Sequence, residues 1–331
     1  MGIELEQYKA NRINTLKNKF SYDKSVLTKH YNTLINNVLK SRAKNKAAQV
    51  NNLRASYTNH IKNLTNQLNN AINVVNAYQP TLVENTKSSR ALLIGCNYNG
   101  SQYQLNGCIN DVKNIQTLIN KHGFNNVTLL TDETEQKPNK STILSEFKNL
   151  LMNSNSGDLL FFSYSGHGSY VLDKNGDEKD GYDELIVPLD LNVITDDELK
   201  TIIQAYLKPN VTLFSLFDSC FSGSVLDLKY QYLDSLNYDN YTENNNTNDT
   251  LGNVLMISGC TDKQTSADAF INNISQGAMT WSFIESVNNN PNLSWRELIK
   301  NMRDLLKKSN YDQIPQLSTG QIFNIDSKIF I

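Results

Sequence analysis

The sequence is poor in the features that mark several common protein classes. Its 331 residues include only six prolines and four cysteines, and no apolar run approaches the ~20 residues that cross a bilayer. The cysteines are far apart and form no C-x-x-C pair, which argues against a zinc site or a disulfide framework. The N-terminus lacks the apolar core of a secretory signal. We therefore expect a cytoplasmic protein with reduced thiols and no secretory or transmembrane segment.

Glycine and proline are also absent from Ile3 to Gln79. In this stretch apolar residues recur at steps of three and four, which predicts two long helices, interrupted at residues 40–46 and forming a hairpin or coiled coil. Residues 1–80 hold 12 basic and 3 acidic residues, a charge of +9, whereas the whole chain carries −2. Such a basic arm favours an anionic partner, self-association, or docking onto the acidic remainder of the chain.

After residue 88 the pattern changes to strands that alternate with helices, which is typical of an α/β domain with a mostly parallel sheet. Residues 238–253 are polar and rich in asparagine, as in a loop or linker. The expected strands are 91–95, 127–130, 158–164, 211–218, 254–258 and 321–325, and the expected helices are 108–122, 141–153, 196–206, 278–288 and 295–308.

Two of the apolar runs end in chemically active side chains. His167 follows the run Leu159–Tyr164, and Cys220 follows the run Thr212–Phe217. Because the carboxyl ends of parallel strands line the ligand crevice of an open sheet, we expect an imidazole beside a thiol, which suits nucleophilic attack on a carbonyl. The alternative is a structural histidine and an inert buried cysteine. Cys96, Cys108 and Cys260 fit that alternative better than Cys220 does.

The residues around these two positions resemble a known family. Five segments carry the likeness: Ser165-Gly166-His167-Gly168, Asp218–Ser224, Leu226-Asp227-Leu228, Ile257–Asp268 and Gln313–Ser318. Together they resemble the metacaspases, of type I, in the caspase-like cysteine peptidases. The resemblance covers residues 90–331 and implies a caspase-like α/β/α sandwich with a mostly parallel central sheet, preceded here by the α-helical N-terminal extension. The peptidase domain would comprise a larger part (88–228), a linker (229–253) and a smaller part (254–331).

The resemblance implies a role for each matching residue. Cys220 would be the nucleophile and His167 the general base, with the amides of Gly168 and Cys220 holding the oxyanion. The substrate would be a protein or peptide with arginine or lysine at the cleaved position, because two carboxylates suit a cationic side chain. The pocket for that side chain would consist of Cys108, Asp111, Ser165 and Asp218.

Calcium activation and self-cleavage are further implications of the resemblance. The calcium ligands would be Asp183, Asp196, Asp197 and Asp227, although Asp196 and Asp197 could instead cap a helix. A zymogen of this kind cuts itself after basic residues. Lys229 is the only basic residue between Cys220 and Lys263, and exposed arm residues are further candidates: Lys40, Arg42, Lys44 and Lys46.

Two functions from different classes therefore remain. The favoured one is a calcium-activated, thiol-dependent endopeptidase (a hydrolase) that cleaves after arginine or lysine and undergoes autoprocessing. The alternative is a catalytically minor scaffold or interaction protein that acts through its basic helical arm. A third interpretation, in which the arm covers the active site as a regulatory element, joins the two.

Overall fold

The computed structural model describes residues 2–77, 87–172, 182–220, 225–232, 241–244, 249–259, 268–271 and 274–330. Contacts divide the chain into two compact units, one formed by the N-terminal helices and the other containing the described residues from 87 onward. Within the described residues, no helix combines the length and the apolar character that a membrane crossing requires.

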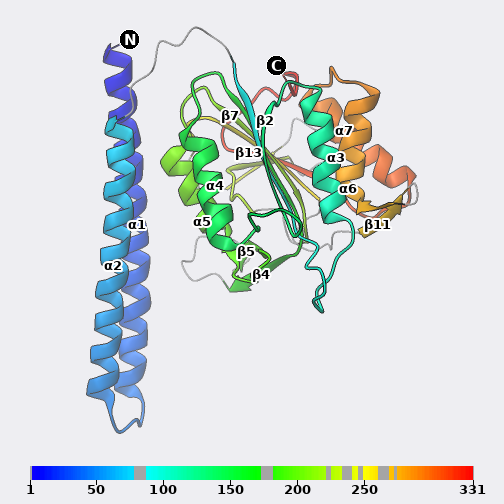
Figure 1. Cartoon of the computed structure of the whole chain (residues 1–331). Coiled ribbons are helices and arrows are strands. Elements are labelled where there is room, and N and C mark those ends of the chain that lie inside the picture. The colour runs from blue at the N-terminus through cyan, green and yellow to red at the C-terminus, as the bar shows by residue number, and fades with distance from the viewer. Residues whose placement is uncertain are drawn as a thin grey trace. The chain divides into compact units, whose positions relative to one another are not determined.

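The N-terminal unit is an antiparallel helical hairpin of α1 (Gly2–Lys40) and α2 (Lys46–Ala77) (Figure 1). Inside it the Tyr31 hydroxyl lies 2.8 Å from Nδ1 of His60, and the Thr28 and Tyr57 hydroxyls lie 2.9 Å apart. The rings of Tyr31 and Tyr57 also meet edge to face. These specific contacts between helices fix how the two helices align along their length.

The second unit is built on an eight-stranded mixed sheet with the order β2-β1-β3-β7-β10-β13-β8-β9. The first five strands in that order run parallel, and the last three pair antiparallel. The parallel strands are β2 (Asn126–Thr131), β1 (Ser89–Gly95), β3 (Leu159–Ser165), β7 (Thr212–Asp218) and β10 (Asn253–Ser258). The antiparallel strands are β13 (Gln316–Thr319), β8 (Tyr230–Tyr232) and β9 (Thr242–Glu243).

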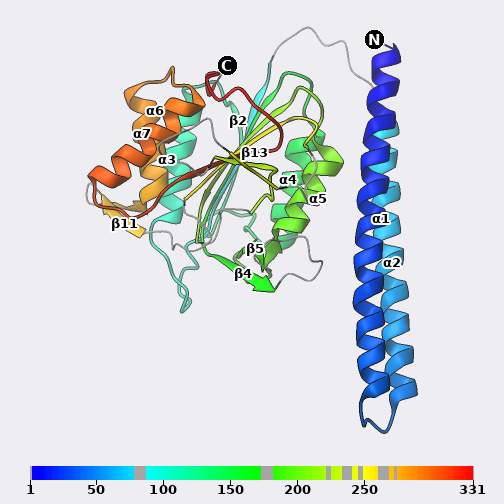
Figure 2. The same ribbon diagram turned by 180° about the vertical axis from the view of Figure 1, so that it is seen from behind.

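Helices cover both faces of this sheet, as two opposite views show (Figures 1 and 2). One face carries α3 (Cys108–Asn120), α6 (Ala278–Asn289) and α7 (Trp295–Lys308). The other carries α4 (Lys140–Met152) and α5 (Asp196–Tyr206). The predicted α/β/α sandwich is therefore confirmed.

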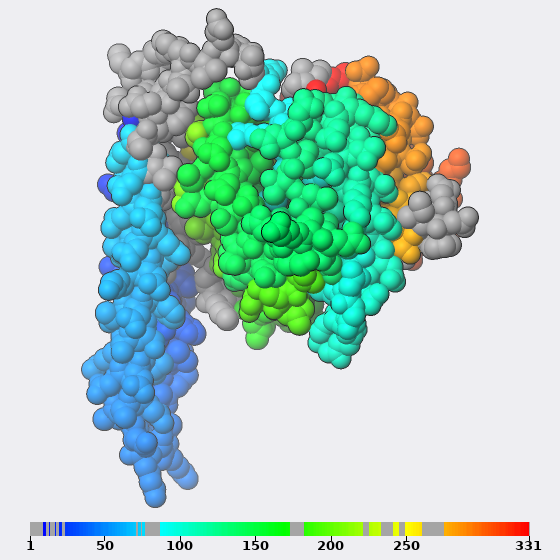
Figure 3. All heavy atoms as spheres, viewed as in Figure 1, coloured from blue at the N-terminus to red at the C-terminus, as the bar shows by residue number. Residues whose placement is uncertain are grey.

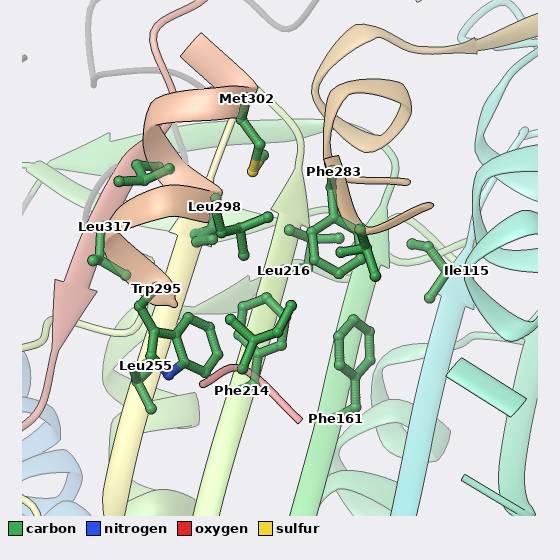
Figure 4. Close-up of a cluster of buried hydrophobic side chains, with 14 of the residues drawn as sticks. Ile115, Phe161, Phe214, Leu216, Leu255, Phe283, Trp295, Leu298, Met302 and Leu317 are labelled. Carbon is green, nitrogen blue, oxygen red and sulfur yellow. The ribbon is translucent and has the colours of Figure 1, made fainter. Parts of the chain in front are cut away.

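Burial on both faces explains why the central strands read as unbroken apolar runs. Successive side chains of a strand point to opposite faces. In β3, Phe161 belongs to the core beneath α3, α6 and α7, and Phe162 to the core beneath α4 and α5. The first core packs Phe161, Phe214, Phe283 and Trp295 ring against ring (Figure 4).

Two small sheets flank the central one. The chain leaves β3 and enters β4 (Gly168–Leu172), which pairs with β5 (Tyr182–Ile186), and β5 pairs with β6 (Ile194–Thr195). A separate hairpin of β11 (Asp268–Ile271) and β12 (Ile274–Gly277) leads directly into α6.

The prediction of a C-terminal strand at 321–325 is wrong, because the last strand of the structure lies at Gln316–Thr319. Its polar side chains Gln316, Ser318 and Thr319 are buried, so the local pattern did not show a strand. The polar segment 238–253 is likewise not all loop, since it contributes the two residues of β9 and the first residue of β10.

Candidate active site

The structure brings the main chains around His167 and Cys220 together. Ser165 and Asp218 are register partners at the ends of β3 and β7, and His167 and Cys220 each lie two residues beyond. The Gly166 N–H donates to the Asp218 carbonyl at 3.4 Å. A Cβ placed on Gly168 would overlap the Cys220 carbonyl oxygen and lie 3.2 Å from Cβ of Ser219. The glycine after the histidine is therefore required by close contact with the Cys220 main chain.

The imidazole of His167 has a defined orientation. Its Nε2 lies 2.7 Å from the main-chain carbonyl oxygen of Tyr103. A carbonyl can only accept, so Nε2 carries the proton and donates, which leaves Nδ1 as the basic nitrogen. The Tyr98 ring lies against the imidazole with centres 4.8 Å apart. The loop between β1 and α3 that supplies both tyrosines leaves the sheet near β4 (Figure 1) and protrudes at the lower edge of the surface (Figure 3).

Three described cysteines differ in environment. Cys220 is half-buried, whereas Cys96 and Cys108 are buried. Burial raises the pKa of both inner thiols, and the nearby carboxylates of Asp132 and Asp111 raise the pKa of Cys96 and Cys108 further. A thiol with a raised pKa is a poor nucleophile near neutral pH. Cys220 is therefore the candidate nucleophile among these three, and Cys260 lies outside the described residues.

The four predicted pocket residues are close together. Asp111, on α3, and Asp218, at the end of β7, are 1% and 6% exposed. The Ser165 hydroxyl donates to Oδ2 of Asp111 at 2.7 Å. A Cβ placed on Gly277 would clash with the carboxylate of Asp218 and lie 3.0 Å from Oδ2 of Asp111. Cys108 is at the start of the same helix as Asp111 and has its pKa raised by both carboxylates.

Sequence reasoning missed what holds these carboxylates. The N–H of Gly277 donates to Oδ1 of Asp111 at 2.8 Å, and the N–H of Thr280 donates to Oδ2 of Asp218 at 2.9 Å. Both amides belong to the first turn of α6 or its N-cap. The positive end of that helix dipole therefore favours two negative charges side by side. Gly277 was visible only as a glycine just before a predicted helix.

The predicted calcium ligands fall into two sets. Asp183 lies on β5, and Asp196 and Asp197 open α5. Asp196 accepts from the N–H of Glu184 at 3.0 Å and of Asp197 at 2.7 Å. Burial, followed by the charges of Glu184, Asp197 and Asp183, raises the pKa of Asp196 to about 9. The charges of these four acidic residues therefore crowd one another, and Glu184 is a member that was not among the predicted ligands.

Asp227, the other predicted ligand, pairs with a cation of the protein itself. It forms a buried ion pair with Lys200, which lies one turn after Asp196 on α5, and it accepts from Nδ2 of Asn244 at 3.0 Å. Within the described part of the chain, no three of the side chains that commonly bind metals are arranged as a ready site. The cap of α5 is a capping box of Thr195 and Glu198, not of the two aspartates; Asp196 and Asp197 occupy the first turn, where their negative charge still suits the helix dipole.

The candidate cleavage points differ in accessibility. Lys229 directly precedes β8, its ammonium pairs with Asp249 at 2.9 Å and Glu243 at 3.3 Å, and its carbonyl accepts from Asn244 at 2.7 Å. The arm candidates lie around the turn of the hairpin. There Lys40, Arg42 and Lys44 are exposed and Lys46 is half-buried.

Comparison with known proteins identifies the family of the chain. The model of the metacaspase peptidase C14 domain matches residues 89–229. Metacaspase-1 of Meyerozyma guilliermondii is 36% identical over 284 residues, covering 70% of this chain and 69% of that protein. Metacaspase-1A of Aspergillus terreus is 37% identical over 293 residues, covering 73% and 72%. Among solved structures, protein GSU0716 of Geobacter sulfurreducens aligns with a TM-score of 0.56 at 25% identity, over 73% of this chain and 98% of that one. Because these metacaspases are more than 30% identical to the chain, which covers over two thirds of each of them, the chain belongs to the metacaspase family of C14 cysteine peptidases.

Proposed function

We propose that this metacaspase is a calcium-activated endopeptidase that cleaves after arginine or lysine with Cys220 and His167. The observation that carries the proposal is the contact between Gly168 and the Cys220 main chain at the paired ends of β3 and β7. It puts the residue after the histidine against the residue that bears the thiol.

The chemistry follows from the tautomer of His167. Nδ1 accepts the proton of Cys220, and the thiolate attacks the carbonyl carbon of the scissile peptide bond. The imidazolium then gives its proton to the departing amine, and water releases the acyl group from the sulfur. The Tyr103 carbonyl, which accepts from Nε2 at 2.7 Å, stabilises the cationic ring during these steps. The amides of Gly168 and Cys220 are the proposed donors to the oxyanion.

Arginine or lysine specificity rests on the carboxylates of Asp111 and Asp218. Both have oxygens within 3.0 Å of the point where a Gly277 Cβ would lie, so they form a compact anionic pair. Two adjacent buried carboxylates are costly unless a cation lies between them or hydrogen bonds hold them. A guanidinium or ammonium from the substrate would supply that charge, and Ser165 would hold Asp111 in place.

Calcium activation rests on the cluster of Asp183, Glu184, Asp196 and Asp197. An all-oxygen donor set suits calcium, and the raised pKa of Asp196 reflects negative charges crowded in a buried place. The donor chemistry of these residues suits the ion, although among the described residues they are not arranged as a ready site, so binding would have to draw their carboxylates together. Bound calcium would neutralise this crowding and compete with Lys200 for Asp227. Calcium binding could alter the position of His167, because β4 directly follows His167 and pairs with β5, the strand that carries Asp183.

Self-cleavage after Lys229 requires an opening step. The Lys229 carbonyl accepts a hydrogen bond from Asn244 and its ammonium forms an ion pair with Asp249. The following strand β8 pairs with β13 and β9. We propose that the zymogen resists cutting at Lys229 until the contact between Asp227 and Asn244 is released, whereas the exposed Lys40, Arg42 and Lys44 need no such step.

A direct experiment tests the proposed activity. The purified full chain is incubated with fluorogenic peptides ending in arginine, lysine or aspartate, with and without calcium, beside Cys220→Ala and His167→Ala. We expect calcium-dependent release from the arginine and lysine peptides alone, and none from either variant. Folded wild-type protein that cuts no peptide under either condition would overturn the proposal.

A separate partner function for the arm is favoured by one observation, the charge of +9 over residues 1–80. The chemistry of that charge points to an anionic surface. Retention of the Cys220→Ala chain on vesicles with acidic lipid, lost in high salt and unchanged by calcium, would support it; equal retention on neutral vesicles would contradict it.

A further inference from the structure

Two buried tyrosines meet behind the main chain of His167. Tyr98 comes from the loop after β1 and is 2% exposed, and Tyr164 comes from β3 and is fully buried. Their hydroxyl oxygens are 3.2 Å apart. Burial raises the pKa of both phenols, so each keeps its proton and can both donate and accept.

The hydrogen bonds of these hydroxyls bracket His167 on both sides. Tyr98 accepts from the His167 N–H at 2.9 Å, and the Tyr164 oxygen lies 2.8 Å from the His167 carbonyl oxygen. Both hydroxyls also contact Val187. Its carbonyl oxygen lies 2.5 Å from the Tyr98 oxygen and 2.8 Å from the Tyr164 oxygen, and its N–H is shared between the His167 carbonyl at 3.0 Å and the Tyr164 oxygen at 3.2 Å. Each hydroxyl has one proton to donate: Tyr98 donates to the Val187 carbonyl, and Tyr164 donates to either the His167 or the Val187 carbonyl, which lie at the same distance of 2.8 Å. Core packing alone would not require such a set of bonds.

The backbone at Tyr98 shows that its position is held from outside. Tyr98 has a φ of +52°, a left-handed conformation that is strained for a bulky side chain. On either side of it, the N–H groups of Asn97 and Asn99 donate to the two carboxylate oxygens of Asp132 at 2.8 and 2.9 Å. Asp132 follows β2, so a rigid strand end fixes the strained residue against the imidazole.

The chain also leaves room for the two hydroxyls. A Cβ on Gly166 would lie 2.6 Å from the Tyr164 oxygen and 3.0 Å from the Tyr98 oxygen. Glycine is therefore the residue that lets both tyrosines reach the main chain of the next residue.

We propose that Tyr98 and Tyr164 are positioning residues, whose paired hydroxyls fix the main chain of His167 and so aim its imidazole at Cys220. The inference rests on the proposed function for the reaction that it serves. The Tyr98 ring, 4.8 Å from the imidazole centre, limits ring rotation as well. A misplacement of about 1 Å in a catalytic group can cost ~100-fold in rate.

The test uses Tyr98→Phe, Tyr164→Phe and the double variant, with Tyr206→Phe on α5 as a matched loss of one hydroxyl elsewhere. We expect each single variant to lose about 10-fold to 100-fold in kcat on an arginine peptide with KM unchanged, because the carboxylate pair is untouched. The double variant should lose less than the product of the singles, since the two hydroxyls act as one unit. Tyr206→Phe should match the wild type.

A second readout needs no substrate turnover. The rate of Cys220 alkylation by iodoacetamide, followed against pH, reports the thiolate that His167 supports. We expect the inflection to move to higher pH in both tyrosine variants and to stay in place in Tyr206→Phe. Melting temperatures that fall while kcat and the alkylation profile stay at wild-type values would overturn the inference. A shifted profile in a protein that cuts no arginine peptide would sustain the positioning role while refuting the proposed function.

Discussion

Replacing Asp218 by asparagine separates charge from shape in the proposed substrate site. The amide oxygen of asparagine can still accept from the Thr280 N–H, now at 2.9 Å from the carboxylate, so the main chain of α6 keeps its bond. The negative charge is lost, and a donor nitrogen replaces the second carboxylate oxygen. Asp111 retains its bonds from Ser165 and Gly277 and goes on attracting a cation.

The expected magnitude follows from burial. Asp218 is 6% exposed, and losing one charge of a desolvated charge pair costs about 2–5 kcal/mol, or roughly 30-fold to 5000-fold in kcat/KM. Because Asp111 remains, we expect the lower part of that range, about 30-fold to 300-fold, for an arginine peptide. A citrulline peptide, which has the shape of arginine without its charge, should change by less than about 3-fold.

The assay compares kcat/KM for the two peptides in the wild type and Asp218→Asn. Asp304→Asn is the matched control, because Asp304 is an exposed residue of α7 paired only with Lys300 among the described ion pairs. If kcat/KM falls by the same factor for the arginine and citrulline peptides in Asp218→Asn, the carboxylate does not recognise the substrate's charge and the reasoning is refuted.

Two further changes have outcomes that the structure specifies. The pKa of Asp196 is raised from 3.8 to about 9 on folding, so between these values the folded chain holds a proton that the unfolded chain has released, and stability falls as pH rises. Asp196→Asn removes this loss of stability with rising pH. At pH 8 without calcium the variant should melt at a higher temperature than the wild type, and calcium should no longer raise its melting temperature. A melting temperature below that of the wild type would contradict the prediction. Gly168→Ala would force a methyl group onto the Cys220 carbonyl and should lower kcat at least ~100-fold. Ser169→Ala, at the exposed neighbouring position, should keep kcat within about 2-fold of the wild type. Equal kcat values in the two variants would mean that the contact between Gly168 and Cys220 does not matter.

The central strands could be predicted because their signal is local. Leu159–Tyr164 and Thr212–Phe217 are apolar at every position since both faces of the sheet are covered, and the change to glycine, serine and histidine or cysteine marks where each strand ends. Parallel pairing of neighbouring strand ends then brings residues 167 and 220 to the same edge. The placing of the histidine and the cysteine thus follows from strand positions, whereas the pocket residues and the calcium ligands were predicted only through the family resemblance.

What could not be predicted depends on distant parts of the chain. Tyr103 contributes a carbonyl, which carries no residue-specific signal, and Tyr98 and Gly277 act through contacts with segments 69 or more residues away. The short strand β13 is stabilised by pairing with β10 and β8 and not by its own polar sequence. The pairing of Asp227 with Lys200 likewise needs the fold to bring residues 27 positions apart together.

Covalent labelling measures most directly whether His167 activates Cys220. The full chain is treated at neutral pH with an arginine peptide bearing an electrophilic ketone, and the modified residue is located by mass spectrometry in the wild type, His167→Ala and Cys220→Ala. We expect one adduct, on Cys220, formed much more slowly in His167→Ala, with Cys96 and Cys108 unmodified because burial raises the pKa of their thiols. Labelling of Cys220 at the same rate with and without the imidazole, or an adduct on another cysteine, would contradict the assignment.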